Sequence, residues 1–188
     1  MIHNGTELES MTFNGQEVET WIHNGIEVYS ASKPWIAYNA VSGQMVANSP
    51  ATVPSYSGTM SVQAGNLIWQ VNAQYSSAVI SSKNVDGTEY LPTNKCKYMD
   101  VVVRCDINNT SKCTITGRKN GVETVIRTIT IPKFANNTSN VVEGVTYNQY
   151  THLIKGVDVA DYDSVKIRCE STAYDMCYIG LGYTKFYN

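Results

Sequence analysis

A turn motif that recurs every ten residues opens the sequence and constrains how the N-terminus can fold. The segments 2–8, 12–18 and 22–28 align without a gap, and each has an Asn-Gly pair at the same place. Asn and Gly tolerate the positive φ angles of a type I′ turn, which joins two antiparallel strands. The sequence therefore predicts three short hairpins, with their turns at Asn4, Gly5, Asn14, Gly15, Asn24 and Gly25.

This repeat is too small and too acidic to build a core of its own. Residues 1–31 contain five glutamates and neither Lys nor Arg. The segments between successive turns would form a meander or a small β-stack, and isolated hairpins are only marginally stable in water. We therefore expect residues 1–31 to be an attachment module. Its neighbour would be its own downstream domain, another subunit or a larger assembly.

Residues 32–58 are predicted to connect this module to the main domain. Pro34, Pro50 and Pro54 lie there among small and polar residues, and proline keeps a segment out of central strands. An apolar stretch over residues 35–46 fits either a short helix or an extended arm packed on a neighbour. The sequence leaves both open.

Residues 59–188 show the period-two pattern of half-buried strands. Apolar residues alternate with polar ones in the segments 67–73 and 165–169, and a further apolar row is formed by Met99, Val101, Val103 and Cys105. A further Asn-Gly hairpin is predicted at Asn120 and Gly121. Charged residues make up only 16% of the chain. The fold class is therefore predicted as all-β, with the hairpin repeat followed by a β-sandwich, for which a jelly roll is a candidate topology.

Charge and hydropathy exclude two classes of partner. The net charge is −2, and with five glutamates in residues 1–31 the remainder nets only +3, far from the clustered basic surface that binds nucleic acid. No stretch approaches the roughly 20 apolar residues of a membrane span, and the N-terminus does not resemble a signal peptide. We expect synthesis in a reducing cytoplasm, with the five cysteines as thiols. Cys105 and Cys169 should point into the core.

The residues for catalysis or metal binding are sparse. His152 is the one histidine of the main domain, in a strand pattern, although a Cys-His pair involving it stays an alternative. The cysteine spacing does not fit zinc. Asp158, Asp161, Asp163 and Asp175 could bind calcium but fit a turn equally well. We therefore expect no enzyme, no cofactor and no metal.

Tyrosines near predicted loops are the candidates for ligand contact. They could stack on sugar rings, or they could fill the core or a subunit interface, where aromatic residues are also enriched. The candidate ligand-facing residues are Tyr90, Tyr147, Tyr150, Tyr174 and Tyr178.

The repeat over residues 1–31 resembles the repeats of tail, baseplate and other minor virion proteins of phages infecting Gram-positive bacteria. Its last unit ends with Gly25-Ile26-Glu27-Val28-Tyr29. The resemblance implies a virion structural protein that is made in the host bacterial cytoplasm. It would attach to other virion proteins through residues 1–31 and display the sandwich, for which a host surface glycan is a candidate ligand. Exposed hairpin strands favour a homo-oligomer, and the resemblance favours a trimer.

Several functions remain open beside a tail tip, baseplate or fibre protein. One is a carbohydrate-binding or receptor-binding sandwich that acts by itself. Others are a capsid decoration or head fibre protein, and a hydrolase built on a β scaffold.

Overall fold

The computed structural model of the protein consists of strands and turns, and its described part contains no helix. None of the described residues belongs to a helix that could span a membrane. The structure describes residues 2–3, 6–7, 12–14, 16–18, 20–23, 26–30, 32, 34–41, 44–47, 53–63, 68–74, 77–104, 109–132, 140–142, 145–147, 151–172 and 176–188.

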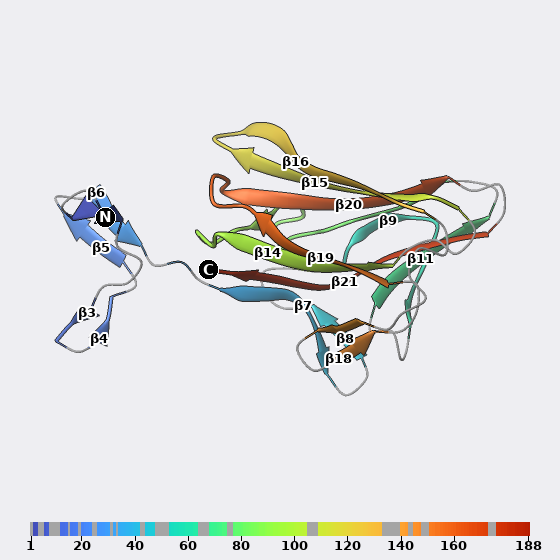
Figure 1. The fold of residues 1–188 in the computed structure, drawn as a ribbon, viewed down its shortest axis with the longest axis horizontal. Coiled ribbons are helices and arrows are strands. Elements are labelled where there is room, and N and C mark those ends of the chain that lie inside the picture. Colours follow the sequence, from blue (N-terminus) through green and yellow to red (C-terminus); the bar gives the residue numbers. More distant parts are fainter. Residues whose placement is uncertain are drawn as a thin grey trace.

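The N-terminal repeat forms three hairpins that lie beyond one end of the sandwich (Figure 1). Their strands are β1 (Ile2–His3) with β2 (Thr6–Glu7), β3 (Thr12–Phe13) with β4 (Gln16–Glu17), and β5 (Thr20–His23) with β6 (Ile26–Ser30). In each hairpin the innermost paired residues flank one Asn-Gly pair, as for Phe13 opposite Gln16. The predicted hairpins are confirmed. The predicted meander is not seen, since each described pair of strands is a sheet of its own.

Among the predicted turn residues, Asn14 is described, and its φ of 51° is the left-handed conformation that the turn requires. Asn4, Gly5, Gly15, Asn24 and Gly25 lie outside the described residues.

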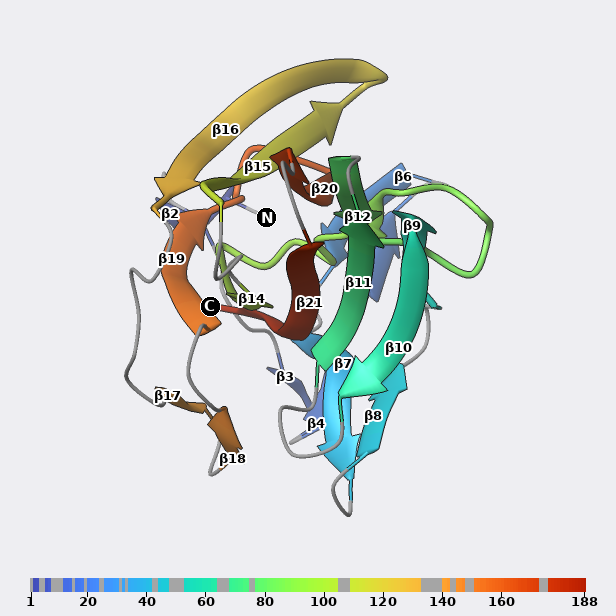
Figure 2. The same ribbon diagram turned by 90° about the vertical axis from the view of Figure 1, so that its right-hand side faces the viewer.

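The main domain is a sandwich of two antiparallel sheets, seen as two layers in Figure 2. We call one layer the β21 sheet, whose described strands run in the order β10-β11-β21-β14-β19, with β7 beside β21 and β8 beside β7. Its strands are β7 (Trp35–Val41), β8 (Gln44–Ala47), β10 (Thr59–Gln63), β11 (Ile68–Gln74), β14 (Tyr98–Arg104), β19 (Thr151–Asp158) and β21 (Met176–Tyr187).

The other layer, the β20 sheet, has the described order β16-β15-β20-β12-β9, with β13 beside β20. Its strands are β9 (Ser55–Ser57), β12 (Ser77–Ser81), β13 (Leu91–Pro92), β15 (Ser111–Lys119), β16 (Val122–Ile131) and β20 (Ser164–Thr172). A small separate hairpin consists of β17 (Asn140–Val142) and β18 (Val145–Tyr147). The chain crosses between the layers several times, for example from β14 to β15 and from β20 to β21. The sandwich is confirmed, and its jelly-roll form stays a prediction.

Inward-facing apolar side chains of both sheets form the core. The predicted rows are buried, among them Val165, Ile167 and Cys169 on β20 and Met99, Val101 and Val103 on β14. The alternation predicts an exposed opposite face, but Gln70 and Val102 are also buried. Both lie on strands with a neighbour on each side, β11 between β10 and β21, and β14 between β21 and β19. A central strand leaves less of its outer face to solvent than an edge strand does.

The expected connector over residues 32–58 needs correction, because much of it belongs to the sandwich. β7 pairs with the end of β21, and β9 pairs with β12. The ring of Trp35 stacks on Phe186 at 5.0 Å between centroids, and its Nε1 donates to the carbonyl of Pro92 at 3.0 Å. Proline is compatible with this arrangement because Pro34 and Pro54 come immediately before β7 and β9, where no ladder hydrogen bond is lost.

Candidate ligand-binding site

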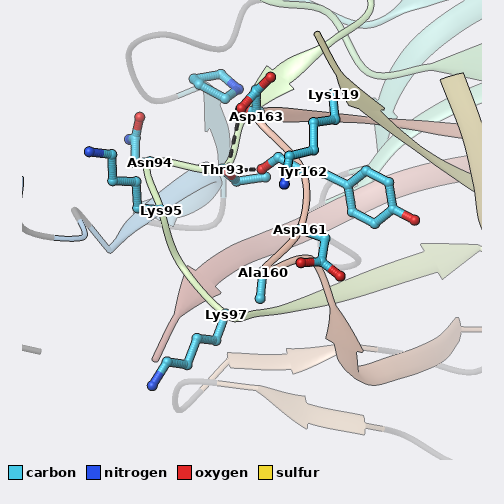
Figure 3. A pocket seen from close by; sticks show the side chains of 10 residues that line it. Thr93, Asn94, Lys95, Lys97, Lys119, Ala160, Asp161, Tyr162 and Asp163 are labelled. Carbon is cyan, nitrogen blue, oxygen red and sulfur yellow. Dashed lines mark hydrogen bonds between the residues drawn. The ribbon is translucent and has the colours of Figure 1, made fainter. Parts of the chain in front are cut away.

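A surface pocket of about 540 Å³ lies at the end of the sandwich where β13 ends and β14 begins. Three segments meet there: the loop from β13 to β14, the turn from β19 to β20, and the end of β15. The pairing of β13 with β20 brings the first two together, since Pro92 lies opposite Ser164. The lining residues are Pro92, Thr93, Asn94, Lys95, Lys97, Lys119, Ala160, Asp161, Tyr162 and Asp163 (Figure 3).

Thr93 joins the two loops that form the pocket. Its Oγ1 donates to the carbonyl of Tyr162 at 2.6 Å, and its backbone N–H donates to the carbonyl of Asp163 at 3.0 Å. The side chain of Thr93 is buried, so these bonds replace contacts with water. The loop backbones at the pocket floor are therefore held in fixed positions.

A tight turn presents two side chains at the pocket rim. The N–H of Cys96 donates to the carbonyl of Thr93 at 3.0 Å, and the two central residues, Asn94 and Lys95, have φ angles of 51° and 59°. Asn is common in this left-handed region, but Lys is not, since its Cβ crowds the backbone. Backbone strain of this kind clusters at ligand-binding sites.

Tyr162 forms one wall and fixes how the turn from β19 to β20 packs. Its ring covers Gly117 on β15 so closely that a Cβ atom there would overlap it. Figure 3 shows the ring directed away from Lys95 and Lys97, which leaves the space beside those lysines unfilled by it. The turn is also tied to β15 by the N–H of Asp163, which donates to the carbonyl of Arg118 at 2.9 Å.

The pocket offers hydrogen-bond donors and acceptors of both charges. Three ammonium groups and two carboxylates line it, and Asp163 accepts from the N–H of Asn120 at 3.0 Å through Oδ2. Asp161 is exposed at the rim. A pocket of this kind suits a polar ligand with several hydroxyl or anionic groups.

The structure does not bring the five predicted tyrosines together. Tyr90 is only 9% exposed, and both Arg118 (4.7 Å from the ring centroid) and Lys166 (5.1 Å) lie against its ring. Burial and the nearby Glu123 raise the pKa of Tyr90 to about 12. The ring of Tyr90 is therefore covered by its own neighbours, and its contact with a ligand stays a prediction.

The other four predicted tyrosines are spread over the chain. Tyr178 is half-buried on β21, opposite Asn72 on β11. Tyr147 lies on β18, in the small separate hairpin. Tyr150 and Tyr174 fall outside the described residues.

The described residues that were candidates for catalysis and metal binding lie on β19 or in the turn that follows it. His152 lies on β19 opposite Val103, and burial, together with the charge of Arg127, lowers its pKa. Asp158 accepts from the N–H of Ala160 at 3.1 Å, as expected for the turn reading. The described residues contain no cluster of three or more His, Cys, Asp or Glu side chains that could hold a metal ion. Asp175 lies outside them.

Sequence reasoning missed most residues of this pocket. The sequence indicates Asp161 and Asp163 as candidate calcium ligands, whereas it does not indicate Thr93, Lys97, Lys119 or Tyr162 as site residues. The turns themselves are readable from Pro92-Thr93-Asn94-Lys95 and from the aspartates around Tyr162. Their meeting depends on the pairing of β13 with β20 across more than seventy residues, which no local pattern specifies.

Comparison with known proteins gives only distant structural likenesses. No model of a known protein family matches the chain, and no curated protein matches it either. A point mutant of the carbohydrate-binding module CBM29-2 aligns with 82% of this chain and 91% of its own, at a TM-score of 0.42 and 13% identity. The enzymatically active domain of tailspike protein 4 of bacteriophage CBA120 aligns with 82% of this chain and 19% of its own, at a TM-score of 0.42 and 8% identity.

A third likeness is to the module CBM6cm-2 of lichenase 5A from Cellvibrio mixtus, solved with cellotriose. It covers 74% of this chain and 90% of that one, at a TM-score of 0.30 and 13% identity. At these TM-scores the likeness is too distant to indicate what this chain binds.

Proposed function

We propose that the chain is a non-catalytic binding module for carbohydrate, with its site at the pocket between β13, β15 and the turn from β19 to β20. The observation that carries this proposal is the composition of the pocket. Hydrogen bonds from Thr93 to the carbonyls of Tyr162 and Asp163 hold two of its loops together. Ammonium, amide and carboxylate groups from three segments line it. Sugars present many hydroxyl groups that both donate and accept, and such mixed polar rims can satisfy them.

Binding rather than cleavage is favoured by the state of the two carboxylates. Hydrolysis of a glycosidic bond ordinarily needs a pair of carboxyl groups, one as acid and one as base or nucleophile. In this pocket Asp163 holds the β15–β16 turn by accepting from Asn120. Asp161 is then the one remaining carboxylate of the pocket, and it is exposed.

A glycan array probed with the full chain tests this proposal. We expect binding to a restricted set of glycans, with loss of signal in the variant Lys97→Ala/Asp161→Ala. The matched control is Lys112→Ala/Glu170→Ala, which removes an equal pair of charges, 3.5 Å apart, from the outer face of the β20 sheet. Equal loss in both variants, or no glycan bound at all, would contradict the proposal.

For the N-terminal repeat, a second role is favoured by the pairing of its strands. Each described hairpin pairs within itself and leaves its strand edges unpaired by the sandwich strands. Unpaired edges recruit other chains. With the sequence resemblance, this supports attachment of residues 1–31 to other virion proteins of a phage, in a tail, baseplate, fibre or capsid, with the sandwich displayed.

Removal of residues 1–31 tests this attachment role. The shortened chain, beginning at Ser32, should keep its folded sandwich and its glycan binding but should no longer be incorporated into particles. Incorporation at the level of the full chain would contradict the role. Light scattering on both forms tests the associated proposal of a homo-oligomer, for which a trimer is favoured. A full-length monomer at high concentration would contradict it.

A further inference from the structure

Two tyrosines lie side by side on the outer face of the β21 sheet, next to the pocket. Tyr98 on β14 is directly opposite Tyr187 on β21, and their ring centroids are 5.9 Å apart with an interplanar angle of 39°. The adjacent residues Met99 and Phe186 are fully buried in the core, so the alternation directs both tyrosines outward. Tyr98 is 40% exposed. The pair forms an aromatic surface that solvent reaches.

Polar groups flank this pair on the same face. Asp158 on β19 lies opposite Tyr98. Asp100, the next residue of β14 on the same face, lies opposite Lys185 on β21. The Oδ1 atom of Asp100 accepts from the hydroxyl of Tyr187 at 2.9 Å and from the N–H of Gly156 at 2.8 Å. Its Oδ2 atom takes part in neither bond. Burial, followed by this bond to Asp100, raises the pKa of Tyr187, so the hydroxyl stays protonated and donates.

Gly156 explains why Asp100 is held in place. The β14–β19 register shifts between Met99 and Val101, and Gly156 lies in this bulge with a φ of 59°. Its N–H is taken up by Asp100. These two hydrogen bonds hold the carboxylate of Asp100 beside the Tyr187 ring.

The tyrosine pair is continuous with the pocket. Lys97 lines the pocket and immediately precedes Tyr98, and its N–H donates to the carbonyl of Tyr187 at 3.1 Å. The carbonyl of Lys97 accepts from the N–H of Val159 at 2.8 Å. Val159 lies between Asp158, beside the tyrosine pair, and Ala160, which lines the pocket. The same strand ends therefore build both surfaces.

We propose that the pocket and the tyrosine pair together bind a chain of neutral pyranose sugars rather than a single sugar. This inference rests on the proposed carbohydrate binding. The apolar C–H face of a pyranose ring packs against an aromatic ring, while its equatorial hydroxyls reach carboxylates beside that ring. Asp100 and Asp158 provide such acceptors beside the rings, and they outnumber the ammonium group of Lys185, whose Nζ lies 5.8 Å from the Tyr187 ring centroid. Acidic sugars are therefore disfavoured above Tyr98 and Tyr187.

The test is calorimetric titration of the full chain with ladders from monosaccharide to hexasaccharide. The neutral ladders contain glucose, galactose, mannose or N-acetylglucosamine, and the acidic ladders contain galacturonate or glucuronate. We expect one neutral ladder to bind most tightly, with affinity that rises with length. Tyr98→Ala should weaken the long members about tenfold and leave the shortest bound member unchanged.

Tyr98→Phe is the matched control, because it keeps the ring and should retain the affinity for long members. Tyr98 is exposed enough that neither variant should unfold the sandwich, which circular dichroism verifies. Affinity independent of length, long members unaffected by Tyr98→Ala, or preference for an acidic ladder would overturn the inference and leave the proposed function standing. Failure of every ladder to bind the unmodified chain would overturn both.

Discussion

Gly117 leaves room for the ring of Tyr162, which lines the pocket. The Tyr162 ring occupies the space where any other residue would carry its Cβ atom. Since this ring forms part of the turn from β19 to β20, a side chain at Gly117 would push that turn outward and move the pocket wall.

Gly117→Ala should therefore destabilise the protein by about 1–3 kcal/mol, the usual cost of overpacking. Chemical unfolding measures this, and a double-mutant cycle identifies the cause. In a Tyr162→Ala background the same substitution should cost much less. An equal cost in both backgrounds would show that the ring is not responsible.

Three cysteines are buried in the sandwich and should react slowly. Cys96, Cys113 and Cys169 are at most 2% exposed, and Cys113 lies opposite Cys169 on neighbouring strands. The prediction that Cys169 points into the core is confirmed, whereas Cys105 lies outside the described residues. Under native conditions a thiol reagent should label these three sites far more slowly than after unfolding. Mass spectrometry of labelled peptides measures this, and fast native labelling would contradict the described packing.

Burial of Cys96 also gives stability a dependence on pH. It raises the pKa of this thiol from 9.0 to about 11, which means that the fold favours the protonated form. This contribution to stability is fully present below pH 9 and is lost as pH rises through 11. The difference in unfolding free energy between the native protein and Cys96→Ala should therefore shrink from pH 9 to 11. A constant difference would contradict the buried position.

Among the elements, β7 shows where local patterns mislead. Prolines on both sides of residues 35–46 suggest a connector, but Pro34 precedes the strand and leaves its ladder intact. Strands with clear alternation, such as β20, and the hairpin turn at Asn120 and Gly121, with φ angles of 50° and 81°, were predicted correctly because both signals are local. Besides its neighbour β8, β7 pairs with β21 at the far end of the sequence, and no short-range pattern predicts that second pairing.

Trp35→Ala tests whether β7 belongs to the sandwich. It removes the stack on Phe186 and the bond to Pro92, so it should lower the unfolding free energy by about 3 kcal/mol. Tyr56→Ala on β9 is the control, since Tyr56 is 52% exposed and should change stability little. If Trp35→Ala were as mild as this control in urea unfolding, β7 would be an arm rather than part of the fold.

At the scale of the whole molecule, the fold class was more predictable than the site. All-β architecture follows from alternation and turn residues along the chain. The pocket requires Thr93 to meet Asp163 through β13 and β20, and the tyrosine pair requires the register that sets Tyr98 opposite Tyr187. Both depend on how distant strands pair. Positions beside predicted loops therefore indicate other tyrosines than Tyr98 and Tyr187, which lie on neighbouring strands.

The most direct test of carbohydrate binding at the pocket is an NMR titration of the labelled full chain with the glycan that the array selects. The backbone amides of residues 93–97 and 160–163 should shift, followed by those of Tyr98 and Tyr187 as longer sugars are added. Shifts centred on the outer face of the β20 sheet, around Lys112 and Arg168, or saturable binding without shifts at residues 93–97 would contradict the assignment of the site.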